Sequence, residues 1–241
     1  MKYIGSKSKI AKDIVPILQR LINDNDIQIY IEPFVGGFNV IDKIKCDYRI
    51  GNDIDSIVID LVEYCRKNPD VLNDLKMPTK DEYYHIRDNK ELYDNWYVAA
   101  ILLFASYNAR VYGGCYGAFA KTKDGGIRNY FEESKRNFQK QLPNLNGIVL
   151  KNKDYRDLNI SKRCLIYCDP PYSTGIGYSC DFDSSEFWEW CRVQSTNGNI
   201  VVVSEYEAPD DFKCIWEKDV KTHQNNRNKL ERTEKLFIYN N

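Results

Sequence analysis

The residues best suited to chemistry are Asp169, Pro170, Pro171 and Tyr172, in the stretch CLIYCDPPYSTGIGY at 164–178. A short apolar run closed by prolines is typical of a buried strand that ends in a turn. Because a proline follows it, Pro170 is restricted to an extended conformation that leaves its carbonyl free. The turn presents two hydrogen-bond acceptors beside an aromatic ring, and the plainer alternative is a rigid turn that only ends the strand.

A second candidate site is the glycine loop EPFVGGFNV at 32–40. Open α/β sheets bind ligands at the carboxyl ends of their strands, where glycine lets a ligand approach the backbone. Asp53 follows at the end of the next expected strand, the usual place for an acid that accepts hydrogen bonds from ribose hydroxyls. No Gly-Lys-Ser/Thr follows, so this is not a phosphate loop. A plain tight turn is the alternative for the glycines.

The elements that must position these residues follow from apolar periodicity. Residues 7–22 have helical spacing, and Pro16 should kink or divide that helix. Residues 27–34 and 48–55 are expected strands, joined by the glycine loop and a helix that Asn39 could cap. This strand, loop, helix, strand order predicts a parallel pair.

The pattern changes between 58 and 147, which are mostly helical. This part includes a buried helix at 96–105, too short to span a bilayer, and an amphipathic helix near 131–142. Between them, 107–131 predicts a hairpin or ordered loop. Strands return at 147–152, 164–168, 199–206, 214–220 and 235–240, with a helix over 183–195 that Asp183 and Glu186 would cap as a capping box. We therefore predict an α/β catalytic domain (1–57 and 148–241) interrupted by a mainly helical insert (58–147).

Bulk composition narrows the class of protein. The 241 residues have a net charge of −1, with 43% apolar and 29% charged residues, so any positive surface must be local. The eight cysteines have no CxxC spacing and are expected to be reduced and buried, and the two histidines lie far apart, so we expect no metal. No targeting segment is visible, which predicts a cytoplasmic protein without membrane contact.

Five motifs, KYIGSKSKI, EPFVGGFNV, NDID, KDYRD and CDPPY, occur in an order that resembles the Dam-type (D12 class) DNA adenine N6-methyltransferases. The resemblance covers essentially the whole chain. It implies a Rossmann-like methyltransferase sheet with helices on both faces, S-adenosyl-L-methionine (AdoMet) as methyl donor, and an inserted target-recognition module.

Carried over by position, the resemblance implies cofactor-binding roles for nine residues. Lys7 lies near the methionine carboxylate, Asp53 binds the ribose, and Asp154 and Tyr155 bind the cofactor adenine. The others are Tyr3, Phe34, Gly36, Gly37 and Asp169. The family loop usually has glycine at position 38, where this chain has Phe38, so the loop is expected to bend differently.

The same resemblance implies that Asp169, Pro170, Pro171 and Tyr172 are catalytic. The exocyclic amine of adenine is a poor nucleophile because its lone pair is delocalised into the ring. Acceptors on its two hydrogens, supplied by Asp169 and the Pro170 carbonyl, would favour a pyramidal nitrogen, and preorganised acceptors lower such barriers. Tyr172 would stack on the target base, which must be flipped out of the duplex to be reached.

The insert is expected to bind double-stranded DNA. Between 110 and 140 there are seven Lys or Arg against three Asp or Glu, interleaved with aromatic residues. Such groups suit phosphates and bases. The candidate nucleic-acid contacts are Arg110, Tyr116, Lys121, Lys123 and Arg128. A second basic patch, KTHQNNRNKLER at 221–232, is expected to be a mobile loop, with simple solvation of its charges as the plainer alternative to DNA contact.

Two other functions stay open from the sequence. The same turn would suit a methyltransferase that acts on cytosine N4 or on RNA. The other alternative is a catalytically silent DNA-binding module, but the intact DPPY motif argues against it. No nuclease motif is visible, so we expect a stand-alone methylase whose restriction endonuclease partner, if any, is a separate chain. The sequence does not predict the oligomeric state.

Overall fold

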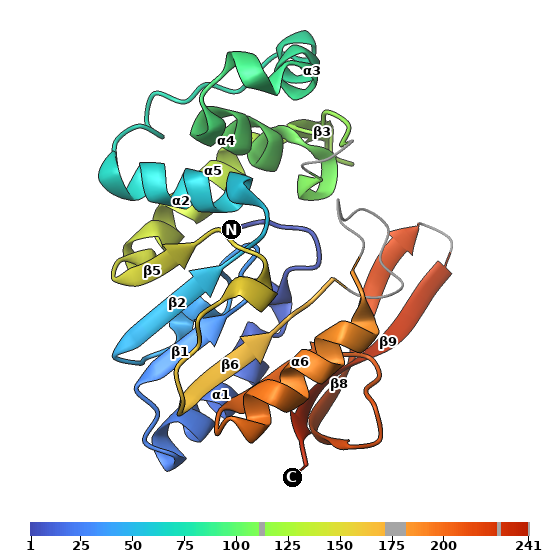
Figure 1. The fold of residues 1–241 in the computed structure, drawn as a ribbon. Helices are drawn as coiled ribbons and strands as arrows, with labels where there is room; N and C mark the ends of the chain where they lie inside the picture. The colour runs from blue at the N-terminus through green and yellow to red at the C-terminus, as the bar shows by residue number, and fades with distance from the viewer. Residues whose placement is uncertain (111–113, 172–181, 226–227, 241) are drawn as a thin grey trace.

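A seven-stranded sheet forms the centre of the molecule, with strand order β5-β2-β1-β6-β7-β9-β8 (Figure 1). The computed structural model describes residues 1–110, 114–171, 182–225 and 228–240, and their side chains except those of 108 and 221–231. The parallel strands are β1 (Ile29–Glu32), β2 (Tyr48–Asn52), β5 (Ile148–Lys151), β6 (Cys164–Cys168) and β7 (Ile200–Glu205). The antiparallel hairpin β8 (Phe212–Asn225) and β9 (Asn228–Tyr239) completes the sheet through β9 and β7.

Helices cover both faces because successive side chains of each strand point in opposite directions. Tyr30, Leu165 and Tyr167 belong to the core that includes α1 (Ala11–Asp24). Ile31, Ile166 and Cys168 belong to a second core beneath α6 (Ser184–Thr196). The predicted Rossmann-like α/β fold class is therefore confirmed.

The strand order reverses between β1 and β6, which pair side by side with Ile31 opposite Ile166. A crevice forms at such a switch point outside the carboxyl ends of the strands, and ligands bind there in open α/β sheets. The EPF stretch follows β1 and the DPP stretch follows β6, so both predicted motifs lie at this edge.

The insert lies beyond that edge, and the arrowheads of β2 and β6 point toward it in Figure 1. It contains α3 (Lys80–Asp88), α4 (Asn95–Ala105), α5 (Tyr130–Gln141) and the hairpin of β3 (Phe119–Lys121) with β4 (Ile127–Asn129), and α2 (Ser56–Lys67) packs against α4. Every residue from Val98 to Ala105 is buried, as predicted for this helix. Short 3-10 helices cover Lys7–Lys9, Ile41–Lys43, Lys90–Leu92, Tyr107–Ala109, Leu142–Leu145 and Tyr155–Asp157. The predicted domain boundaries stay a prediction.

Two local predictions near the amino-terminal end fail, the first in part. Pro16 does not divide helix α1, because Pro16 and Lys12 lie on its exposed face, where water can satisfy the carbonyl that lost its N–H partner, and the kink stays a prediction. Asn39 caps no helix: its side-chain amide donates to the Met1 carbonyl at 2.7 Å and to Ser6 Oγ at 2.7 Å. Only a 3-10 turn follows it.

Two further predictions fail farther along the chain. The basic patch at 221–232 falls within the hairpin strands rather than a loop, apart from 226–227, which lie outside the described residues. The patch is in strands because backbone pairing between β8 and β9 continues as far as Asn225 and Asn228. Among the cysteines described, Cys115 and Cys214 are exposed rather than buried, although all seven are free thiols. No helix within the described residues is long and apolar enough to cross a membrane.

Candidate active site

The residues predicted to bind cofactor converge on one cavity of about 250 Å³ at the switch point. Its walls include every one of them: Tyr3, Lys7, Phe34, Gly36, Gly37, Asp53, Asp154, Tyr155 and Asp169. Pro170 and Pro171 of the predicted catalytic turn also line it. Tyr172 lies outside the described residues. Segments separated by more than a hundred residues in the sequence are thus brought into one site.

The glycine loop is tied to the carboxylate of Asp53. The Gly36 N–H donates to Asp53 Oδ2 at 2.8 Å, and the Asp55 N–H donates to Asp53 Oδ1 at 3.0 Å. Gly36 has a φ of 44°, and a β-carbon there would lie 3.0 Å from the Tyr3 ring. Both the backbone conformation and the close Tyr3 ring therefore disfavour a side chain at position 36.

Asp53 has an unusual protonation equilibrium. Burial raises its pKa from 3.8 to about 6, and the hydrogen bonds from the Asp55 and Gly36 amides only partly oppose this. The carboxylate is ionised at neutral pH, and it lines the cavity as an acceptor. An acceptor that is both charged and nearly dry suits the hydroxyls of a ribose.

Phe38 explains how this chain tolerates the missing family glycine. Its φ is 59°, in the left-handed region that glycine favours, so the backbone takes a glycine-like conformation with a bulky residue. The side chain is fully buried beneath the loop, where it packs close to Gly51. Burial of the ring offsets the backbone strain, which is typically about 1–2 kcal/mol.

Lys7 and Asp169 form a buried ion pair on the chemical side of the cavity. Lys7 Nζ donates to Asp169 Oδ1 at 2.7 Å, and the Lys7 side chain is only 4% exposed. Burial by itself lowers the pKa of Lys7, but the carboxylates of Asp169 and Glu234 outweigh it and hold the pKa above its usual value. The ammonium group therefore stays charged and orients the predicted catalytic carboxylate.

Sequence reasoning missed Glu32, which lines the same cavity at the end of β1. It is 3% exposed and accepts a hydrogen bond from the Tyr30 hydroxyl at 2.7 Å. Burial raises the pKa of Glu32 well above its usual value, although the bond from Tyr30 opposes the shift. Its position directly before the EPF proline was a signal for this role, because a strand-end acid there must face the crevice.

Arg156 is a second missed residue. It contacts Asp154 through two bonds, Nε to Oδ1 at 2.8 Å and Nη2 to Oδ2 at 2.5 Å, and its Nη1 donates to Glu186 at 2.8 Å. The hydrogen bond from Arg156 lowers the pKa of Asp154. Beside this pair, Phe34 packs against Tyr155 and Phe182 with ring centroids 5.2 and 6.0 Å apart. Flat aromatic surfaces next to a carboxylate suit a purine ring.

The predicted nucleic-acid residues fall into different environments. Arg110 is exposed and lines the cavity, and Lys121 and Lys123 are exposed on the β3–β4 hairpin. Arg128, also exposed there, pairs with Glu133 at 2.8 Å. Tyr116 is half-buried, and its hydroxyl donates to the Pro78 carbonyl at 2.8 Å, which gives it a structural contact within the insert.

Comparison with known proteins identifies the family to which this chain belongs. A family model described as D12 class N6 adenine-specific DNA methyltransferase matches residues 3–186. This chain belongs to that family. This membership confirms the predicted family and enzyme class. The family model matches only as far as residue 186, so β7 and the hairpin of β8 and β9 lie outside the matched region.

Two relatives that match this chain are type II methyltransferases by name. The type II methyltransferase M.MjaIII of Methanocaldococcus jannaschii is 26% identical over 200 residues, covering 71% of this chain and 68% of that protein. The type II methyltransferase M.FokI of Planomicrobium okeanokoites is 23% identical over 212 residues, covering 80% of this chain but only 32% of that protein. Among solved structures, the rRNA methyltransferase AviRa of Streptomyces viridochromogenes superposes with a TM-score of 0.45 at 12% identity, covering 96% of this chain and 84% of that chain.

The D12-class family implies AdoMet as methyl donor, and the cavity fits that group. It offers a buried acid for ribose hydroxyls and aromatic surfaces beside a carboxylate. Within the described residues, no group of three or more His, Cys, Asp and Glu side chains could hold a metal ion.

Proposed function

We propose that this chain methylates the N6 amine of a flipped adenine within a specific sequence of double-stranded DNA. The observation that carries the proposal is the common cavity, in which the DPP turn after β6 faces the glycine loop and Asp53. A methyl donor and an amine acceptor can react only if their sites adjoin. The family supplies the class of reaction, and the geometry supports the assignment of residues.

In this proposal the residues divide into a cofactor side and a chemical side. Asp53 binds the ribose, Tyr155 and Phe34 pack on the adenine ring of the cofactor, and Tyr3 supports the loop. AdoMet supplies an electrophilic methyl group on a sulfonium. Asp169 and the Pro170 carbonyl accept hydrogen bonds from the two N6 hydrogens, which directs the nitrogen lone pair toward that methyl group.

Lys7 fixes one oxygen of Asp169 at 2.7 Å, so the carboxylate is held in place before the base arrives. Preorganised acceptors of this kind avoid reorganisation during the reaction. Burial raises the pKa of Glu32, which disfavours a second full charge beside Asp169.

The DNA side of the proposal rests on the insert. Arg110 lies at the cavity, and the β3–β4 hairpin exposes Lys121, Lys123 and Arg128 together with apolar Phe119 and Ile127 at 48% and 71% exposure. Cations suit phosphates, and exposed apolar side chains suit unstacked bases.

The test is methylation of plasmid DNA with labelled AdoMet, followed by digestion to nucleosides. Label in N6-methyladenine at recurring sequence sites is the expected result. Label in N4-methylcytosine, or in RNA but not in DNA, would replace the proposal with the alternative amine substrates. An absence of transfer to any of these would leave only a DNA-binding module.

A further inference from the structure

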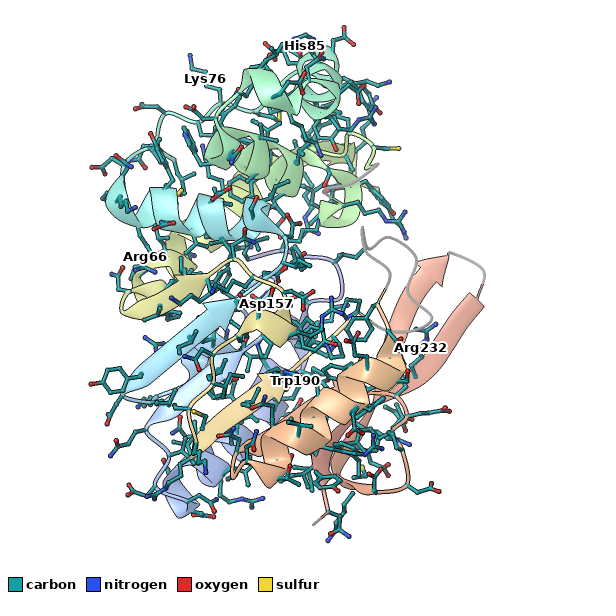
Figure 2. All side chains as sticks on the ribbon, in the orientation of Figure 1. Arg66, Lys76, His85, Asp157, Trp190 and Arg232 are labelled. Atoms are coloured by element: carbon teal, nitrogen blue, oxygen red, sulfur yellow. The ribbon has the colours of Figure 1, made fainter. Side chains whose placement is uncertain are left out.

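A line of polar contacts runs from the C-terminal hairpin to the predicted catalytic carboxylate. Arg232 Nη1 lies 3.4 Å from the Tyr206 hydroxyl, which lies 3.5 Å from Glu234 Oε1. Glu234 Oε2 in turn lies 3.7 Å from Lys7 Nζ, and Lys7 bonds to Asp169 at 2.7 Å. Figure 2 labels Arg232 on this hairpin, outside the family-matched region.

The register of the sheet explains why Glu234 reaches the site. Lys235 on β9 lies opposite Glu205 at the carboxyl end of β7, so Glu234 stands at the same edge as the switch point. Leu236, two residues along, packs into the core that includes α1, and side chains two apart share a face. Glu234 therefore points toward the face where Lys7 precedes α1.

Both side chains of the Lys7–Glu234 contact are buried. Lys7 is 5% exposed and Glu234 is 7% exposed, and two carboxylates therefore flank one ammonium group in a nearly dry setting. In formal charges the set has two negative groups and one positive group, so Asp169 and Glu234 share a single ammonium group.

We propose that Glu234 is a positioning residue for methyl transfer, which holds Lys7 and through it orients Asp169. The inference rests on the proposed function, and it makes the β8–β9 hairpin part of the active site. Because Glu234 shares the charge of Lys7, the ammonium group neutralises Asp169 only in part. The second oxygen of Asp169 then keeps its strength as an acceptor for the adenine amine.

The test compares Glu234→Gln with Asp219→Asn. Both remove one negative charge from the same hairpin with little change in shape, but Asp219 is exposed and accepts only a bond from Thr233 Oγ1 at 2.7 Å among the contacts described. The first measurement is the single-turnover methylation rate at saturating AdoMet and DNA, corrected for the folded fraction. AdoMet affinity is measured separately by calorimetry.

We expect Glu234→Gln to react about tenfold more slowly, as for loss of a weak charged contact, with AdoMet affinity within about threefold of wild type. Asp219→Asn should match the wild type in both. If Glu234→Gln does not fold, Glu234→Asp keeps the charge but lengthens the 3.7 Å contact, and it should still slow transfer severalfold. Equal rates for the Glu234 and Asp219 variants, or a rate loss fully explained by weaker AdoMet binding, would overturn the inference.

A second measurement does not depend on the substrate. In ¹H–¹⁵N spectra, the ammonium protons of Lys7, assigned with Lys7→Met, should exchange with water faster in Glu234→Gln than in wild type or Asp219→Asn. Unchanged exchange would mean that Glu234 does not hold Lys7. If the wild type methylates no DNA, the proposed function fails, and this measurement still decides the contact.

Discussion

The raised pKa of Asp53 predicts that AdoMet binding depends on pH in a specific window. Without cofactor, burial raises the pKa of Asp53 from 3.8 to about 6. Ribose hydroxyls that donate to this carboxylate would favour its ionised form and lower the pKa again. Protons then compete with cofactor, so affinity falls as pH decreases through 6. If the pKa of Asp53 in the AdoMet complex returns to 3.8, linkage between protonation and binding makes AdoMet bind about tenfold more weakly at pH 5 than at pH 7.

The full pKa difference, from about 6 to 3.8, corresponds to about 3 kcal/mol. This value is the largest loss of AdoMet binding free energy that protonation of Asp53 can cause. The perturbation is Asp53→Ala, and the assay is calorimetry at pH 7, 6 and 5 under constant ionic strength. The variant should bind AdoMet about 10–100-fold more weakly at pH 7, because a charged acceptor is lost, and it should lose the pH dependence.

Glu205 is the matched control, since burial raises its pKa from 4.5 to about 7 and it titrates near the same window without lining the cavity. Glu205→Gln should keep the wild-type slope. A wild-type affinity that is flat from pH 7 to 5, or an equal slope in Asp53→Ala, would refute the assignment of Asp53 to the ribose.

Three other predictions test the site and its surroundings. Asp169→Ala should lower the single-turnover rate by about 10²–10³ while AdoMet and DNA still bind, and a wild-type rate would reduce the DPP turn to a strand terminator. Phe38→Gly should destabilise the protein by about 2–4 kcal/mol in urea unfolding, because the buried ring is worth more than the relief of its positive φ, and a stabilised variant would contradict this balance. Removing Arg128 should reduce the salt slope of DNA binding by about one unit, whereas removing Arg110 should relax sequence preference, and unchanged slope and preference would place DNA elsewhere.

Much of the fold was predictable because its signals are local. The apolar runs that become β1 and β6 are short and are followed by Pro33 and Asp169. The parallel pairing of β1 with β2 was expected from a helical connection, although only the 3-10 turn Ile41–Lys43 lies between them. The glycine loop, Asp53 and Asp169 were predictable at the cavity because strand ends at a switch point must meet. The other cavity residues, such as Lys7 and Asp154, followed from the resemblance to the D12-class family.

Other features depend on contacts that periodicity does not encode. The tolerance of Pro16 depends on which face of α1 is exposed, and the hairpin at 212–239 depends on pairing with β7 through β9. Arg156 looks like any surface charge in the sequence, yet it engages Asp154, the acid expected to bind the cofactor adenine. Cofactor binding must therefore share Asp154 with Arg156 or move Arg156 onto Glu186, which it already contacts.

The order in which the site can form follows from where its parts lie in the chain. Lys7 comes from the first turn, Asp53 follows β2, Asp169 follows β6, and Glu234 belongs to the last strand. The buried ion pair of Lys7 joins residues 162 positions apart, so it cannot exist until β6 has paired with β1. Before that, Lys7 and Asp169 lie in separate parts of the chain. Glu234 joins them when β9 adds to β7, which brings a second carboxylate to 3.7 Å from the Lys7 ammonium group.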